Sequence, residues 1–181
     1  NRVTDWQQVA GLELLPDLLV NESGLPNFSM LRSLLEMRAS LAVDAARLAT
    51  SRADADIVLQ LQEVVERMRK RPNDVEYLQG EVQSFWDILV RAAGNQVYVM
   101  AFNSLALCWW RYGAHLRHLL SDELRAINQY QAIVDACRKR DPDRAAKHAG
   151  HLVQMAAEQI EKVSSGYQQR QSVNNGDLFS M

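Results

Sequence analysis

The stretch "SLLEMRASLAVDAARLA" (residues 33–49) decides the fold class that we predict for this chain. Its apolar residues recur every three or four positions, which is the spacing of one face of an α-helix. The full stripe runs from residue 31 to residue 48, and the one charged side chain within it belongs to Arg38. Removing a guanidinium from water is costly unless an anion lies beside it. The pattern therefore predicts an anionic partner for Arg38 inside the protein.

Two kinds of partner for Arg38 stay open at this point. A glutamate or the carbonyl end of a neighbouring helix can neutralise the charge, or the long stem can carry the guanidinium out to solvent. Alternatively, a bound ligand supplies the anion as a carboxylate or a phosphate. The spacing alone does not distinguish a structural arginine from a ligand-binding one.

The rest of the chain continues the helical period, and strand patterns are nearly absent. Breaks fall at "NESGLPN" (21–27), "SRADAD" (51–56), "KRPND" (70–74) and Gly94. We predict an all-α fold, an antiparallel bundle of about seven helices with a central ligand cavity, in which the last helix ends near Ser164. The predicted helix caps are Asn73, Asn95, Ser121 and Asp141.

Two acidic residues, Asp122 and Glu123, follow the predicted cap at Ser121. They lie in the first turn of the expected helix, where negative side chains interact favourably with the positive end of the helix dipole. We therefore interpret them as residues that stabilise the start of this helix.

The composition is that of one folded domain with a sizeable core, since 48% of the 181 residues are apolar and 23% are charged. A formal charge of -2 and a pI of about 6.1 give no basic surface for nucleic acid on this stretch. We expect Cys108 and Cys137 to be buried free thiols in a reducing cytoplasm. No apolar run approaches the roughly 18 residues of a membrane span, so we expect no membrane partner.

Sequence motifs for catalysis are absent. There is no GxSxG, no HExxH, no glycine-rich phosphate loop and no cysteine with an evident histidine partner, so we predict that the chain is not an enzyme. His115 and His118 lie three residues apart, as do His148 and His151, and metal ligands can have this spacing. No acidic residue clearly shares their inner faces, however. The residues alone thus favour a binding module.

Three segments together resemble a known family. They are "LRSLLEMRASLAVDAARLA" (31–49), "FWDILVRAAGNQVYVMAFNSL" (85–105) and "YQAIVDACRKRDPDRAAKHAGHL" (130–152). The combination is similar to the C-terminal ligand-binding domain of GntR-type transcription regulators of the FadR group, from about residue 5 to residue 163. Its most specific elements are Glu36 with Arg38, the "AAGN" before the longest apolar segment, and the run from Asp141.

The resemblance implies an effector domain that follows a winged-helix DNA-binding domain absent from this sequence. Residues 1–24 would then be a linker and first helix, 25–165 the helical effector-binding domain, and 166–181 a flexible tail. The intact protein would be a homodimeric, cytoplasmic regulator that binds DNA through its winged helices. A small-molecule effector would control it.

Many members of the family hold a metal through an Asp and a His four residues apart and two later histidines. The corresponding positions here are Val82, Trp86, Gln131 and His151. One neutral imidazole cannot hold a metal tightly, so we predict neither a metal nor another cofactor.

Loss of the metal makes the chain similar to the fatty-acid branch of the family, whose effectors are fatty acyl-CoAs. The chain departs from that branch at Leu152, Val153 and Ala157. The resemblance implies an acyl tail lying among Leu34, Trp86, Leu89, Phe102, Leu105 and Trp109. It implies these effector-binding residues: Arg38, Trp86, Tyr98, Asn103, Trp109, Arg111, Gly150, His151 and Lys162.

Two alternatives to an acyl-CoA sensor stay open. One is a metal-dependent sensor of small carboxylates with the same fold. The other is a helical adaptor without a ligand, in which the core is filled and protein acids neutralise Arg38.

Overall fold

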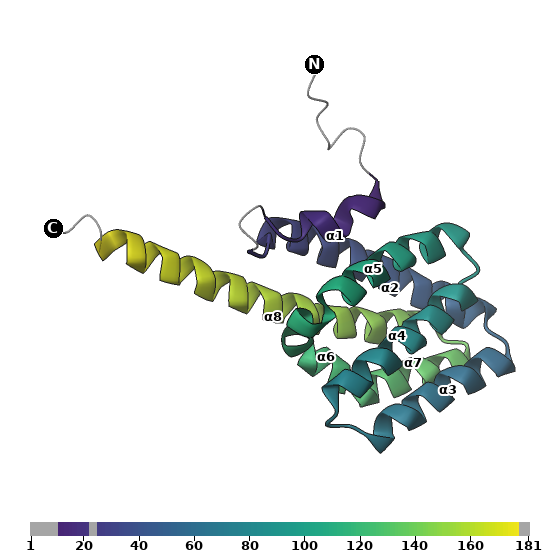
Figure 1. Cartoon of the computed structure of the whole chain (residues 1–181). Helices are drawn as coiled ribbons and strands as arrows, with labels where there is room; N and C mark the ends of the chain where they lie inside the picture. Colours follow the sequence, from purple (N-terminus) through teal and green to yellow (C-terminus); the bar gives the residue numbers. More distant parts are fainter. Residues whose placement is uncertain (1–10, 22–24, 178–181) are drawn as a thin grey trace, which may run out of the picture.

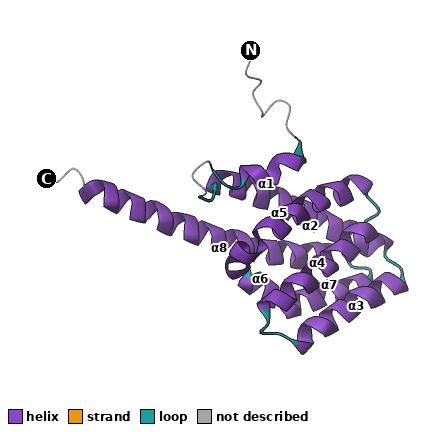
Figure 2. Cartoon of the chain, viewed as in Figure 1, coloured by secondary structure: helices purple, strands orange, loops and turns teal. Residues whose placement is uncertain are grey.

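The computed structural model describes residues 11–21 and 25–177, and in these ranges the chain is helical (Figure 1, Figure 2). It forms eight α-helices and a short 3-10 helix there, and no strand, which confirms the predicted all-α class. The elements are η2 (Leu12–Leu14), α1 (Leu15–Leu18), α2 (Phe28–Arg52), α3 (Ala55–Lys70), α4 (Val75–Ala92), α5 (Gln96–Leu119), α6 (Ser121–Arg125), α7 (Ile127–Lys139) and α8 (Pro142–Asp177).

One predicted helix is divided into two. The backbone of Ala126 leaves the helical region, with φ -75° and ψ 47°, so α6 ends after five residues and α7 begins beyond it. Ser121 does not cap α6 but is its first residue, and the preceding Leu120 makes no side-chain cap bond. Alanine favours helix, so the sequence carries no local signal for this break.

Asn and Asp side chains cap several helices. Asn95 accepts hydrogen bonds from the first backbone N–H groups of α5, at 3.1 and 3.3 Å, and Asp141 accepts one at the start of α8, at 3.0 Å, as predicted. The cap of α4 is Asp74 rather than the predicted Asn73. Gly94 has a φ of 62°, a left-handed conformation that favours glycine, and it ends α4 as expected.

The main core lies between α2, α3, α4, α7 and α8, and α2 packs most extensively against α8. Alanines dominate the buried face of α2, and small side chains allow a short distance between helix axes. Larger side chains fill the space beyond them. The largest fully buried residues include Leu61, Met68, Leu78, Phe85, Leu89, Leu124, Tyr130 and Ile133.

A second, smaller apolar cluster joins α1, α5 and the outer parts of α2 and α8. Its buried members include Leu31, Cys108 and Ile160. Cys108 and Cys137 are buried free thiols, as predicted, and burial raises the pKa of both. None of the described helices is long and apolar enough to cross a membrane.

The last helix is longer than the sequence pattern predicts. α8 continues past Ser164 to Asp177 and extends away from the bundle (Figure 1). Its first half packs on α2 and α7, which explains why the apolar period is strong only there. The flexibility expected for residues 166–181 stays a prediction.

We predict that Leu61→Ala lowers the free energy of unfolding by about 2–5 kcal/mol, because Leu61 is fully buried and its truncation leaves a cavity. Leu59, on the same helix, is 57% exposed, and Leu59→Ala should change stability by less than about 0.5 kcal/mol. Urea denaturation of both variants measures the difference. Equal losses would show that the packing of α3 is described incorrectly.

Candidate functional site

The anionic partner of Arg38 is a glutamate of the protein itself. Arg38 of α2 donates two hydrogen bonds to the Glu123 carboxylate of α6: Nη1 lies 2.8 Å from Oε2, and Nη2 bonds Oε1. The Arg38 side chain is 19% exposed and that of Glu123 is 1% exposed. Of the two kinds of partner that the sequence left open for Arg38, the structure thus shows an acid of the protein and not a ligand.

Electrostatics favour the charged form of Arg38 in this pair. Burial lowers the pKa of Arg38, but the charge of Glu123 and its hydrogen bonds outweigh that effect, so the net shift of the pKa is upward. The sequence pattern predicts that Glu123 stabilises the start of a helix. Instead, the break at Ala126 makes α6 a single short turn, and the side chain of its Glu123 points inward to α2.

A small pocket lies beside the ion pair, and we call it the inner pocket. Its volume is about 70 Å³, well below the roughly 300–1,000 Å³ of sites for drug-sized ligands, so the structure does not show an open central ligand cavity. Arg38 is the one charged residue among the described residues that line it. The other lining residues are Leu31, Leu34, Leu35, Val82, Gln83, Trp86, Phe102, Leu105, Ala106, Cys108, Trp109, Leu120 and Ile160.

Buried polar atoms without partners surround the same region. Trp86 Nε1, Trp109 Nε1 and the Tyr130 hydroxyl are each buried and form no hydrogen bond of good geometry among the described residues, although the Tyr130 hydroxyl lies near enough to Trp86 and Glu123 for hydrogen bonding to affect its pKa. Trp86 is 4% exposed and Tyr130 is fully buried, its ring meeting Phe85 edge-on at 5.1 Å. Unpaired buried donors are rare in native proteins, and they often mark a site for a ligand or a water molecule.

Tyr130 remains protonated in this setting. Burial raises its pKa well above the ordinary value, and the negative charge of Glu123 adds to the rise, while Arg38 opposes it. Tyr130 thus offers a neutral hydroxyl beside the ion pair. It was not among the predicted site residues, because an aromatic residue in a helical stripe is usually ordinary core.

A larger groove, which we call the α2–α8 groove, shares two lining residues with the inner pocket. Its volume is about 320 Å³, and Leu35 and Ile160 line both it and the inner pocket. Its other apolar lining residues are Phe28, Ala39, Val153 and Ala157, and polar side chains at its rim include Arg32, Glu36, Gln154 and Glu161.

The structure brings four of the nine predicted site residues to these two hollows. Arg38, Trp86 and Trp109 line the inner pocket, and Gly150 lines the α2–α8 groove. Of the side chains predicted to hold an acyl tail, Leu89 alone does not line the inner pocket, because it is buried in the main core.

The other five predicted residues lie elsewhere. The Tyr98 hydroxyl donates to Asp44 at 2.6 Å, and Arg111 forms an ion pair with Asp17 of α1 at 2.6 Å. Three are exposed on the surface, away from both hollows: Asn103, His151 and Lys162.

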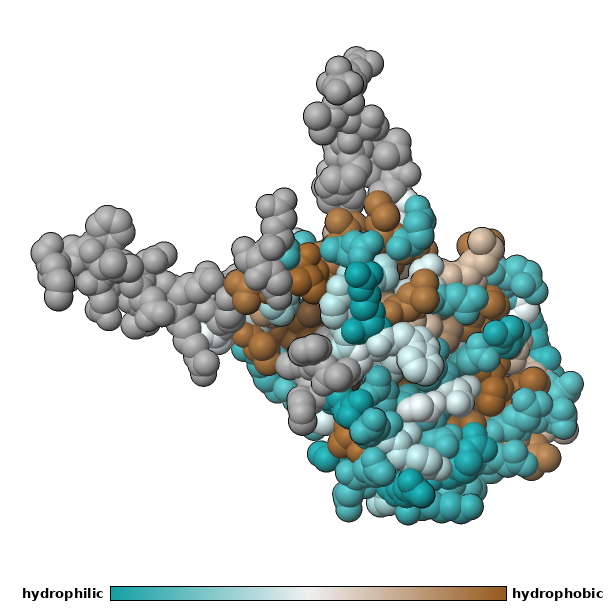
Figure 3. Space-filling view, in the orientation of Figure 1, coloured by the Kyte–Doolittle hydropathy of each residue, from teal (hydrophilic) through white to brown (hydrophobic). Residues whose placement is uncertain are grey.

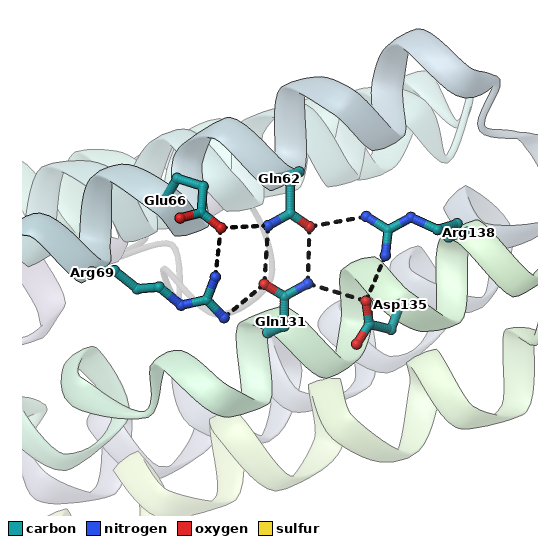
Figure 4. Close-up of polar contacts among 6 residues, drawn as sticks. All are labelled: Gln62, Glu66, Arg69, Gln131, Asp135 and Arg138. Carbon is teal, nitrogen blue, oxygen red and sulfur yellow. Dashed lines mark hydrogen bonds and ion pairs between the residues drawn. The ribbon is translucent and has the colours of Figure 1, made fainter.

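The positions that correspond to metal ligands in the family do not converge either. Val82 and Trp86 face the inner pocket, but Gln131 faces α3, where its amide exchanges two hydrogen bonds with Gln62, at 2.9 and 3.1 Å (Figure 4). Two arginines, Arg69 and Arg138, close this polar ladder on either side (Figure 4). In the part of the chain that the structure describes, no three His, Cys, Asp or Glu side chains gather.

The fold and the sequence together define the class of this chain. It belongs to the FCD-domain family, the C-terminal effector-binding domains of GntR-type regulators, since the FCD domain matches residues 33–155, more than half of the chain. The solved structure of a GntR protein from Streptococcus agalactiae shares the fold, with a TM-score of 0.59 and 20% identity over 77% of this chain and 66% of that one.

Two mycobacterial proteins are similar to this chain, with 29% identity over 154 residues. They are the "Uncharacterized HTH-type transcriptional regulator Mb0601" of Mycobacterium bovis and the "HTH-type transcriptional regulator Mce2R" of Mycobacterium tuberculosis. The alignments cover 85% of this chain but 63% of each relative, so the chain spans less than two thirds of their length. Because these relatives are transcriptional regulators, the prediction that the chain is not an enzyme is confirmed.

We predict strong coupling between Arg38 and Glu123. Arg38→Met leaves a buried carboxylate without a counter-ion and should lower the free energy of unfolding by about 3–5 kcal/mol. The double variant Arg38→Met/Glu123→Gln removes both charges and should recover part of that loss. A double-mutant cycle by urea denaturation measures the coupling energy.

The exposed pair Asp87–Arg91, whose charged atoms lie 2.9 Å apart, is the matched control for this cycle. Its side chains are 41% and 60% exposed, so its coupling energy should lie between about 0 and 1 kcal/mol. A value as low for Arg38 and Glu123 would contradict a buried ion pair.

Proposed function

We propose that this chain is the effector-sensing part of a DNA-binding regulator of the fatty-acid-responsive FadR branch, and that its effector is a fatty acyl-CoA or a related lipid. The observation that carries the proposal is the inner pocket. It combines an almost wholly apolar lining with buried, unpartnered N–H donors beside the Arg38–Glu123 pair. Such a mixture suits a ligand with a long apolar part and one polar group.

An elongated ligand also fits the arrangement of the two hollows. Leu35 and Ile160 line both the inner pocket and the α2–α8 groove, so we infer that rotation of these two side chains would join the hollows into one channel. Each buried methylene of an acyl chain contributes about 0.8 kcal/mol to binding. Ala157 helps to keep the groove open, because its small side chain leaves space where the related branch has an aromatic ring.

In the intact protein, we infer that a winged-helix domain outside this sequence binds DNA in the cytoplasm. An effector that prefers one helix arrangement changes the population of that arrangement and thereby the affinity for DNA. The HTH-type description of the two mycobacterial relatives supports this inference.

We further propose that the regulator is a homodimer that pairs through the outer face of α5. Four apolar side chains there are each more than half exposed, and their spacing places them on one side of the helix. They are Val97, Met100, Leu107 and Trp110. Figure 3 shows hydrophobic patches on the face that carries α1 and α5. Exposed apolar patches of this kind commonly mark protein interfaces.

We expect acyl-CoAs to raise the melting temperature of the protein. At a ligand concentration one hundred times the Kd, the gain is about 2.7 kcal/mol, which corresponds to about 5–10 °C for a domain of this size. Thermal unfolding with octanoyl-, dodecanoyl- and hexadecanoyl-CoA measures it. No shift with any of them would contradict the proposed function.

A pocket tryptophan and an exposed leucine provide a test variant and its control for the same assay. Trp109→Ala removes an indole that lines the inner pocket and should abolish most of the shift. Leu59 of α3 is 57% exposed and lines neither hollow, and Leu59→Ala should leave the shift unchanged. Equal effects of the two substitutions would place the ligand somewhere else.

The dimer has its own test. Met100→Glu places a charge in the centre of the apolar face of α5 and should convert the protein to a monomer in analytical ultracentrifugation. Leu59→Glu makes the same change at an exposed leucine of α3 and should leave the sedimenting mass unchanged. A monomeric wild-type chain, or a dimer that survives Met100→Glu, would disprove this interface.

A further inference from the structure

The charges at the inner pocket are balanced before any ligand enters. Glu123 meets the Arg38 guanidinium with both carboxylate oxygens, and its side chain is 1% exposed. We propose that the inner pocket selects an uncharged carbonyl head group, as in an ester, thioester or amide, over a free carboxylate of the same chain length. This inference rests on the proposed function and narrows its ligand class.

A free carboxylate has two routes into this site, and both are unfavourable. It can replace Glu123 at Arg38, which leaves the Glu123 carboxylate buried without a counter-ion. It can also enter beside the intact pair, which gives the pocket a net negative charge. Either route places an uncompensated anion among apolar side chains, where burial of a charge is very costly. No second cation is available in the pocket, since Arg38 is the one charged residue among its described lining.

The polar atoms that lack partners favour the uncharged alternative. An indole N–H is a donor and cannot accept, so the unpartnered N–H of Trp109 requires an acceptor, while the Trp86 N–H has the Tyr130 hydroxyl within reach. A carbonyl oxygen offers two lone pairs and brings no net charge. The rest of the lining is apolar apart from Gln83, so it suits the hydrocarbon that follows the head group. A thioester presents this combination, and so does a simple ester.

The test compares three probes with the same acyl chain: octanoate, methyl octanoate and N-methyl octanamide. Isothermal titration calorimetry with the wild-type protein at neutral pH should give affinities for the ester and the amide at least about tenfold above that for octanoate. The difference should shrink as the pH falls through the pKa of octanoic acid, because the protonated acid is itself an uncharged carbonyl compound. Equal or tighter binding of octanoate at neutral pH would overturn this inference and leave the proposed function intact.

A variant tests the part played by Glu123. Glu123→Gln keeps the shape of the side chain but removes its charge, so Arg38 becomes available to an anion. The preference should then move toward octanoate by about tenfold or more. Glu63→Gln, the same change at an exposed residue of α3, should leave the preference unaltered.

The outcomes separate the two proposals. An unchanged preference in a folded Glu123→Gln protein would overturn the selection mechanism. If this variant does not fold, the wild-type comparison decides alone. If none of the three probes nor any acyl-CoA binds the wild-type protein, the proposed function and this inference both fall.

Discussion

A single buried ion pair, Arg38 with Glu123, sets the arrangement of the helices around it. α2 carries the arginine into the apolar interior, and such a charge is tolerated only beside a carboxylate. That carboxylate comes from α6, which ends after one turn at Ala126. Because of this break, α6 does not continue along the axis of α7. Glu123 of α6 can therefore face α2, while Tyr130 of α7 packs in the main core.

The ion pair also explains how this chain differs from relatives that bind a metal. The family resemblance implies that in those proteins a metal ion inside the domain attracts a carboxylate effector. Here Val82 and Trp86 occupy two ligand positions with apolar groups, and Gln131 is engaged with Gln62 of α3. The remaining internal cation, Arg38, already has its anion in Glu123. The chain therefore neutralises its internal cation itself, and the proposed effector would be recognised through hydrogen-bond donors and apolar area.

Sequence patterns predict the helices of this chain better than they predict its site. The apolar period and the caps Asn95 and Asp141 are local properties, so they appear directly in the sequence. The need of Arg38 for an anion is equally visible, but the identity of that anion depends on a backbone break at Ala126 that no local residue signals. Glu123 was thus assigned to a helix start.

The site residues that were assigned from family resemblance alone also depend on contacts that the local sequence does not reveal. The resemblance implies effector-binding roles for Tyr98 and Arg111, but here each meets an acidic residue on a neighbouring helix, Asp44 and Asp17. Trp86 and Trp109 reach the pocket because their placement follows from the apolar faces of α4 and α5.

α5 connects the two proposals made for this chain, since its inner face lines the pocket and its outer face carries the exposed apolar residues. A ligand in the inner pocket contacts α5, and any displacement of this helix moves the surface through which two copies would pair. Effector binding and dimer geometry are then properties of the same helix, which is the physical condition for one to control the other.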